Sequence, residues 1–151
     1  MLTENYYHNG YVTHNLDGAL EIFESRFGIS DFVTSDATFN LKTPAGEQSS
    51  SVRIALRPGI ELIQPVSGFQ DQVTSYLPRD SSDPSPRLNH IALRRGDLAS
   101  MRKEIHSLGL PVILETERPG VVVTIYVDAR AELGHYLEFI WHAPSIQGHG
   151  R

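Results

Sequence analysis

The 151-residue sequence has no cysteine, no excess of basic residues and no long apolar run. Without cysteine there can be no disulfide framework, thiolate nucleophile or zinc knuckle, which suits a reducing compartment. The formal net charge of −5 provides no basic stripe for a phosphate backbone, which argues against nucleic acid as a partner. The longest apolar run, 121–127, contains Thr124 and is far too short to cross a bilayer. The first seven residues also lack the charged start and apolar middle of a signal peptide, so we expect a cytoplasmic protein without a membrane partner.

Hydrophobic residues make up 40% of the chain, which is enough for one compact domain. The clearest feature of the sequence is an internal repeat. His90 in the second half corresponds to His8 in the first, and in both halves the histidine is followed seven residues later by Asn15 or Asp97 and then by leucine. The repeat predicts two similar structural units in tandem.

Each half continues with a helical pattern after this histidine. Apolar residues recur at spacings of three and four over 16–27 and again over 98–108, which predicts two amphipathic helices. Polar side chains that can cap the first turn precede both helices, and glycines that adopt a left-handed conformation at low cost follow them. These residues are Asn15 and Asp97 at the N-caps, and Gly28 and Gly109 at the C-caps.

The remaining segments of both halves are rich in strand formers. Strands are predicted over 7–13, 32–41, 51–56 and 60–63 in the first half, and over 89–94, 112–116, 121–128 and 135–141 in the second. The fold class is therefore α+β: one domain, 1–151, of two tandem βαβββ modules. The modules span 6–66 and 88–143. The linker between them, 67–87, is polar and interrupted by prolines, and a short helix is predicted within it at 69–77. A polar tail follows over 144–151.

Two glutamates occupy matching strands of the two modules. Glu61 and Glu138 both interrupt apolar runs, and a carboxylate on a buried strand face requires a partner such as a metal ion. If the sheets face each other about a pseudo-twofold axis, both glutamates can converge with His8 and His90. Two imidazoles and two carboxylates would hold a divalent first-row ion and leave two positions for water or substrate. Such an ion can stabilise an enolate while a carboxylate moves a proton.

Other polar residues could contribute to a substrate-binding wall. Tyr136 and His142 lie on the strand face of Glu138 by alternation, and Arg53 and Thr124 are further candidates. The pair Arg94-Arg95 is predicted to face solvent, and the linker is predicted to be a solvated connection.

Four segments of the sequence resemble the ligand-bearing segments of the vicinal oxygen chelate superfamily, in order. They are His8 with Asn15-Leu16-Asp17, Gly59-Ile60-Glu61-Leu62, Asn89-His90-Ile91-Ala92-Leu93 and Tyr136-Leu137-Glu138-Phe139. Within the superfamily the chain is most similar to glyoxalase I and methylmalonyl-CoA epimerase. The resemblance implies that the two modules form a curved mixed sheet around a metal-binding cleft. The resemblance implies that His8, Glu61, His90 and Glu138 are metal ligands, that Glu138 also serves as the acid/base with Glu61 sharing this role, and that the protein is a homodimer.

The resemblance implies an isomerase or lyase that depends on one divalent ion, which could be Zn, Ni, Co, Mn, Mg or Fe. The enzyme would act on a small carbonyl or thioester compound through a metal-stabilised enolate. Two alternatives remain. An extradiol-type Fe(II) dioxygenase of the same superfamily would use two histidines and one glutamate, leaving the other glutamate dispensable. A metal-free ligand-binding protein, like the bleomycin-resistance members, would use an apolar pocket.

Overall fold

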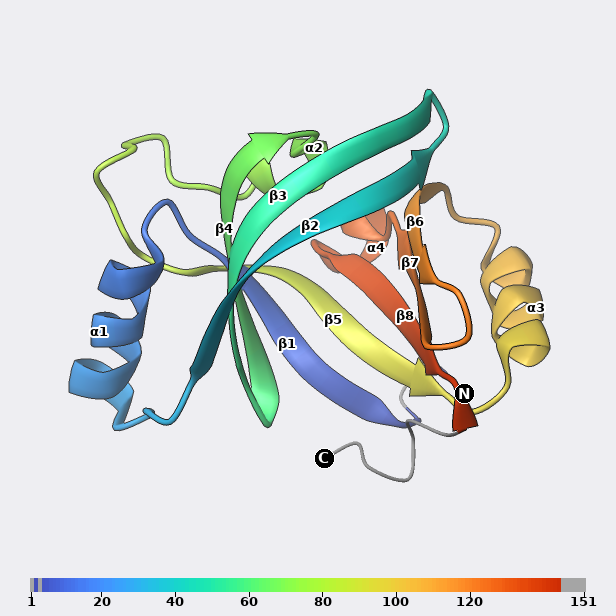
Figure 1. Cartoon of the computed structure of the whole chain (residues 1–151), viewed down its shortest axis with the longest axis horizontal. Coiled ribbons are helices and arrows are strands. Elements are labelled where there is room, and N and C mark those ends of the chain that lie inside the picture. The colour runs from blue at the N-terminus through green and yellow to red at the C-terminus, as the bar shows by residue number, and fades with distance from the viewer. Residues whose placement is uncertain (1, 3, 145–151) are drawn as a thin grey trace. The chain divides into compact units, whose positions relative to one another are not determined.

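The computed structural model describes residue 2 and residues 4–144, which form eight strands and four helices (Figure 1). The predicted tail lies outside the described residues from position 145 onward. In chain order the elements are β1 (Tyr6–Val12), α1 (Leu16–Phe27), β2 (Val33–Thr43), β3 (Gly46–Arg57), β4 (Gly59–Gly68), α2 (Asp71–Thr74), β5 (Arg87–Arg95), α3 (Leu98–Leu108), β6 (Val112–Arg118), β7 (Val122–Val127), α4 (Arg130–Leu133) and β8 (Tyr136–His142).

The strands pair in the order β1-β4-β3-β2-β6-β7-β8-β5 and close into a barrel. The sheet is mixed because β5 and β8 run parallel, whereas β3 with β4, β6 with β7, and β7 with β8 are antiparallel. The predicted α+β class and the strand-helix-strand-strand-strand order of both halves are therefore confirmed, apart from the additional short helix α4 before β8.

The two long helices begin and end where the sequence predicts. The Asn15 side chain accepts a hydrogen bond from the Gly18 backbone N–H at 3.0 Å, and the Asp97 carboxylate accepts one from the Ser100 N–H at 2.8 Å. Gly28 ends α1 in the left-handed region, as Gly109 ends α3. None of the helices in the described part of the chain has the length and apolar character needed to span a membrane.

The short helices differ from the sequence prediction. The predicted helix over 69–77 is limited to α2, a single turn at Asp71–Thr74. The helix α4 was not predicted at all. The Asp128 carboxylate stabilises its start by accepting hydrogen bonds from both the backbone and the guanidinium of Arg130, and Gly134 ends it in the left-handed conformation.

The chain divides into two compact units, of which unit 1 comprises Met1–His8, Asn40–Gln48 and His90–Arg151. Its core forms where α3 covers one face of β5, β7 and β8, because Met101 and Ile105 pack against Leu137 and Phe139. The other face of β5 and β8 therefore lies away from α3.

Unit 2 comprises Asn9–Phe39 and Ser49–Asn89, and its sheet is covered on both faces. Leu16 and Phe23 of α1 pack against Leu62 of β4 on one face. On the other face, Ile63 belongs to a second apolar cluster that includes Val73 of α2.

The segment between the modules is tied to the first of them rather than fully solvated. The Thr13 hydroxyl donates to the Pro84 carbonyl at 2.8 Å, and the His14 imidazole lies 2.7 Å from the Pro78 carbonyl oxygen. Residues 79–82 are exposed, but residues 83–86 are half-buried. The prediction of a solvated connection is thus wrong for this half-buried stretch, where the Pro84 carbonyl accepts the hydrogen bond from Thr13.

Candidate metal centre

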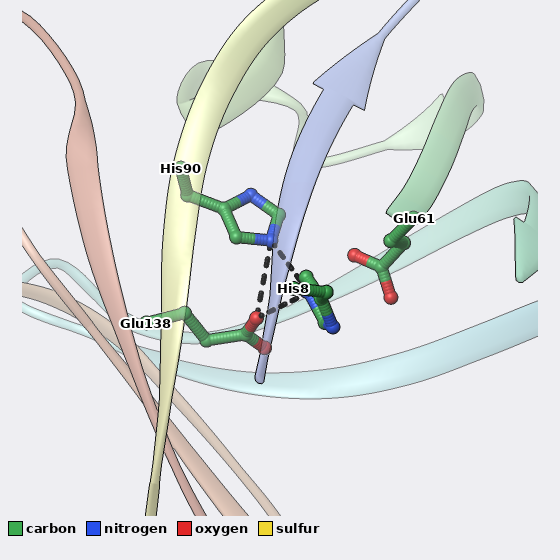
Figure 2. A group of neighbouring side chains, drawn as sticks. All are labelled: His8, Glu61, His90 and Glu138. Carbon is green, nitrogen blue, oxygen red and sulfur yellow. Dashed lines mark hydrogen bonds and ion pairs between the residues drawn. The ribbon is translucent and has the colours of Figure 1, made fainter. Parts of the chain in front are cut away.

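Three of the predicted ligands meet within unit 1, on three different strands (Figure 2). His8 comes from β1, His90 from β5 and Glu138 from β8, and their exposed fractions are 5%, 0% and 6%. The Glu138 Oε2 atom lies 3.3 Å from His8 Nε2 and 3.1 Å from His90 Nε2. The two Nε2 atoms are 3.2 Å apart. One carboxylate oxygen and two imidazole nitrogens therefore point at one another.

The spacing of these three atoms fits a shared metal ion. Imidazole nitrogen and carboxylate oxygen bind Zn²⁺ at about 2.1 Å, so two such ligands at right angles are about 3.0 Å apart. The three distances of 3.1 to 3.3 Å are close to this value. Two nitrogens and one oxygen form a donor set that suits divalent first-row cations.

The electrostatic environment keeps the Glu138 carboxylate ionised. Burial by itself raises the pKa of Glu138, but the charge of His90 and the hydrogen bonds of both imidazoles outweigh it and hold the pKa at about 2. A carboxylate that is already deprotonated at neutral pH loses no proton when it binds a cation. Glu138 is thus prepared to act as a ligand.

Tyr126 is a neighbour of this centre that the sequence interpretation missed. It lies on β7 directly opposite Glu138, and its hydroxyl is 3.5 Å from His90 Nδ1, at the long end of a hydrogen bond. A partner at Nδ1 orients an imidazole so that Nε2 faces a metal ion. Tyr126 could have been found by alternation, because it lies two residues from the candidate Thr124 on the same strand face.

The fourth predicted ligand, Glu61, belongs to unit 2. It lies on β4 opposite Leu56 of β3 and is half-buried. Its role as a fourth metal ligand stays a prediction.

Three predicted wall residues share the sheet face of Glu138 in unit 1. The pairing of β7 with β8 places Thr124 opposite Ile140, next to the Tyr126–Glu138 pair, and the Thr124 hydroxyl forms a short hydrogen bond with that of Thr116. Tyr136 is buried, and the Arg130 guanidinium covers its ring at 4.8 Å. His142 is half-buried, and its pKa is lowered by burial and by the charge of Arg94.

The fourth predicted wall residue, Arg53, lies on the other face of its sheet. It pairs with Gln64, whose side chain accepts a hydrogen bond from the Leu16 N–H at the start of α1. Glu61 is three positions from Gln64 along β4 and therefore points to the opposite face. Arg53 lies 3.7 Å from the carboxylates of both Asp17 and Asp36. It does not share a wall with Glu61.

The prediction that Arg94 and Arg95 both face solvent is wrong. The Arg95 guanidinium forms two hydrogen bonds, of 2.6 and 2.8 Å, with the Glu104 carboxylate of α3 and lies over the Phe139 ring. Consecutive residues of a strand point to opposite faces, so Arg94 shares the face of His90 and Glu138. It is half-buried there.

The chain shares its fold with solved methylmalonyl-CoA epimerases. No protein-family model matches the chain and no curated protein matches its sequence. A variant of the Streptomyces coelicolor enzyme, solved in complex with 2-nitronate-propionyl-CoA, has a TM-score of 0.59 and 17% identity over 92% of this chain and 97% of that one. The Mycobacterium tuberculosis enzyme has a TM-score of 0.57 and 17% identity over 97% and 93%. A hypothetical protein from Bacillus halodurans C-125 has a TM-score of 0.55 and 14% identity over 91% and 93%.

Proposed function

We propose that the protein is a divalent-metal-dependent isomerase or lyase of the glyoxalase or epimerase type. Its substrate would be a small carbonyl or thioester compound whose carbon acid is deprotonated to an enolate. The observation that carries this proposal is the convergence of His8, His90 and Glu138, with their three ligand atoms 3.1 to 3.3 Å apart.

Each residue of the candidate site has its own role in the proposed reaction. His8, His90 and Glu138 would hold the ion, and Glu61 would be the fourth ligand. When bound, a divalent cation supplies Lewis-acid stabilisation for the negative oxygen of an enolate. Glu138 and Glu61 would act as the acid/base pair that removes a proton from the substrate and returns it. Tyr126 would keep Nε2 of His90 directed at the ion.

The structural neighbours support a thioester as the substrate class. One neighbour was solved in complex with methylmalonyl-CoA and NH₄⁺. The proposed ion is one of Zn, Ni, Co, Mn, Mg or Fe. We also propose a homodimer that functions in the cytoplasm, for which sedimentation equilibrium of the full chain would give twice the chain mass.

A second function is favoured by the composition of the metal centre in unit 1. Two histidines and one carboxylate form the facial donor set of non-haem Fe(II) oxygenases. His8, His90 and Glu138 match this set without Glu61. In an extradiol-type dioxygenase, Glu61 would therefore be dispensable.

Metal analysis of protein purified without chelator tests the proposed centre. We expect a stoichiometric divalent ion in the wild type and in Glu47→Ala, a control that removes an exposed glutamate. His90→Ala and Glu138→Ala should lose the ion, because each removes one of three converging ligands. Equal metal content in all four proteins would contradict the proposed ligands, and the absence of metal from all four would favour a metal-free ligand-binding protein.

Proton exchange in deuterium oxide then tests the reaction. We expect metal-loaded protein to exchange the acidic proton of a 2-oxo thioester, a methylmalonyl-type thioester or a hemithioacetal, as followed by NMR. Glu138→Gln and Glu61→Gln should both abolish exchange. Oxygen consumption with a catechol by the iron-loaded protein, unaffected by Glu61→Gln, would instead support the dioxygenase.

A further inference from the structure

A cavity of about 380 Å³ lies on the sheet of unit 2. Residues of three strands line it, among them Asp36 and Thr38 of β2, Ser51 and Arg53 of β3, and Val66 of β4. Its volume falls within the range of cavities that bind small molecules, about 300 to 1,000 Å³. The proposed metal-dependent reaction assigns no role to this cavity or to the guanidinium of Arg53.

Short side chains explain the hollow in this face of the sheet. Ala55 of β3 is buried in the apolar cluster that includes Leu16 of α1. By alternation Arg53 and Ser51 lie on the same face as Ala55, further toward the start of β3. The hydroxyl oxygens of Ser51 and Thr38 are 2.9 Å apart, and neither side chain is long enough to fill the space beside Arg53.

A β-bulge adds an apolar side chain to the cavity. Ser67 and Pro65 of β4 pair with consecutive residues of β3, so Val66 between them is the extra residue of the bulge. The Gln70 amide fixes this geometry by donating hydrogen bonds to the carbonyls of Ser51 and Ser67, at 2.9 and 2.8 Å. Val66 is 58% exposed and offers an apolar surface to a ligand.

Arg53 is flanked by two carboxylates that it does not bind tightly. Its Nε atom lies 3.7 Å from Oδ1 of Asp36, and its Nη2 atom lies 3.7 Å from Oδ1 of Asp17. A charge-assisted hydrogen bond would bring such atoms to about 2.7 to 2.9 Å. The two aspartate side chains are also highly exposed, so water screens both pairs. The guanidinium, whose Nη1 atom takes part in neither pair, can therefore bind a further group.

We infer that the cavity binds a free α-amino acid with an apolar side chain. The carboxylate of the amino acid accepts hydrogen bonds from the Arg53 guanidinium, its ammonium group pairs with Asp36, and its side chain packs against Val66. The ammonium and carboxylate groups of an amino acid share one carbon atom, which suits the 3.7 Å between Arg53 and Asp36. A simple anion would be repelled by the two aspartates, and a simple cation by the guanidinium. Binding at this cavity does not require the metal centre.

Titrations of the full chain with three small probes, followed by the NMR shifts of backbone amides, test this site. The probes are L-leucine, isocaproate, which lacks the ammonium group, and isoamylamine, which lacks the carboxylate. We expect L-leucine to cause saturable shifts in β2, β3 and β4. Each of the other probes should bind roughly tenfold more weakly or worse, because it loses one charge-assisted contact. Arg53→Gln and Asp36→Asn should each weaken the binding of L-leucine by a similar factor.

Arg79→Gln is the matched control, because it removes an exposed arginine of unit 2 and should keep the wild-type affinity. Amino acids also chelate metal ions, so the titration is repeated on chelator-treated wild type, which should bind L-leucine equally well. Loss of binding after chelation would place the amino acid at a metal ion and overturn the inference. The absence of saturable shifts in the three strands, equal affinity for all three probes, or unchanged binding by Arg53→Gln would overturn it as well.

Discussion

The sheet faces that carry the two glutamates have different compositions in the two units. In unit 2, the face of Glu61 also carries Ile54 and Ile63, which belong to an apolar cluster with Val73 of α2. In unit 1, the face of Glu138 carries His90, Tyr126, Thr124, His142 and Arg94. Both units nevertheless have a long helix with a polar side chain at the N-cap and a glycine at the C-cap. The repeat thus preserves the scaffold, while the polar groups gather in unit 1.

This difference predicts that the two units contribute differently to the stability of the fold and to the binding of metal or substrate. Apolar side chains that are fully removed from water stabilise the fold, whereas buried polar groups cost free energy unless they are paired. We therefore expect substitutions on the apolar clusters of unit 2 to change stability alone. Substitutions on the polar face of unit 1 should change metal or substrate binding.

Leu62→Ala in unit 2 should have the largest effect on stability. Leu62 is 0% exposed and packs against Leu16 and Phe23, so its truncation leaves a cavity that costs about 3 kcal/mol of unfolding free energy. Urea denaturation measures this cost, and the folded variant should keep its metal. Val66→Ala, at an exposed position of the same strand, should change stability by less than about 0.5 kcal/mol. Similar costs for both variants would refute the assignment of this core.

Glu138→Gln should alter how stability depends on pH in metal-free protein. The pKa of Glu138 is about 2 in the fold against 4.5 in the unfolded chain, so the ionised form contributes on the order of 3 kcal/mol. A lowered carboxyl pKa gives a contribution that is complete above pH 4.5 and is lost as the pH falls toward 2. The stability difference between wild type and variant should therefore shrink over that range in acid-dependent urea titrations. A difference that does not vary with pH would contradict the ionised centre.

The Thr116 and Thr124 pair tests whether the polar face of unit 1 tolerates apolar replacement. Thr124→Val should cost about 1 kcal/mol, because it leaves the Thr116 hydroxyl without the partner it has now. The double replacement by valine removes both hydroxyls and should cost less than Thr124→Val alone. Thermal unfolding of the two single variants and the double variant measures the coupling. Additive losses would show that the two hydroxyls do not act as a pair.

The helix caps should have effects no larger than that of Thr124→Val, and the effects should be similar in the two units. Asn15→Ala and Asp97→Ala each remove one hydrogen bond to the first turn of a helix and should each cost about 1 kcal/mol. Chemical denaturation compares the two losses, with Glu24→Ala on the exposed side of α1 as a control. A large loss at one cap and none at the other would show that the two helix starts are not equivalent.

Sequence reasoning was most successful where the signal is local. The bounds of α1 and α3 follow from apolar spacing between a capping side chain and a glycine, and all these signals lie within 14 residues of chain. The three candidate ligands that converge in unit 1 were predicted because the repeat marks His8 and His90 as equivalent, and because Glu138 interrupts an apolar strand.

Sequence reasoning was least informative where strand pairing decides the outcome. The face of Arg53 depends on its pairing with Gln64, which the sequence alone does not specify. The contrast between Arg94 and Arg95 was readable from alternation, but the acceptor for Arg95 is Glu104, on a different element. Helix α4 is a single turn stabilised by Asp128 and is too short to show a periodic pattern.

Anomalous X-ray diffraction from crystals of the metal-loaded protein tests the metal centre most directly. The account predicts one anomalous peak that lies about 2.1 Å from Nε2 of His8, Nε2 of His90 and Oε2 of Glu138. A peak at any other place, or no peak at these three atoms in protein that carries stoichiometric metal, would contradict it.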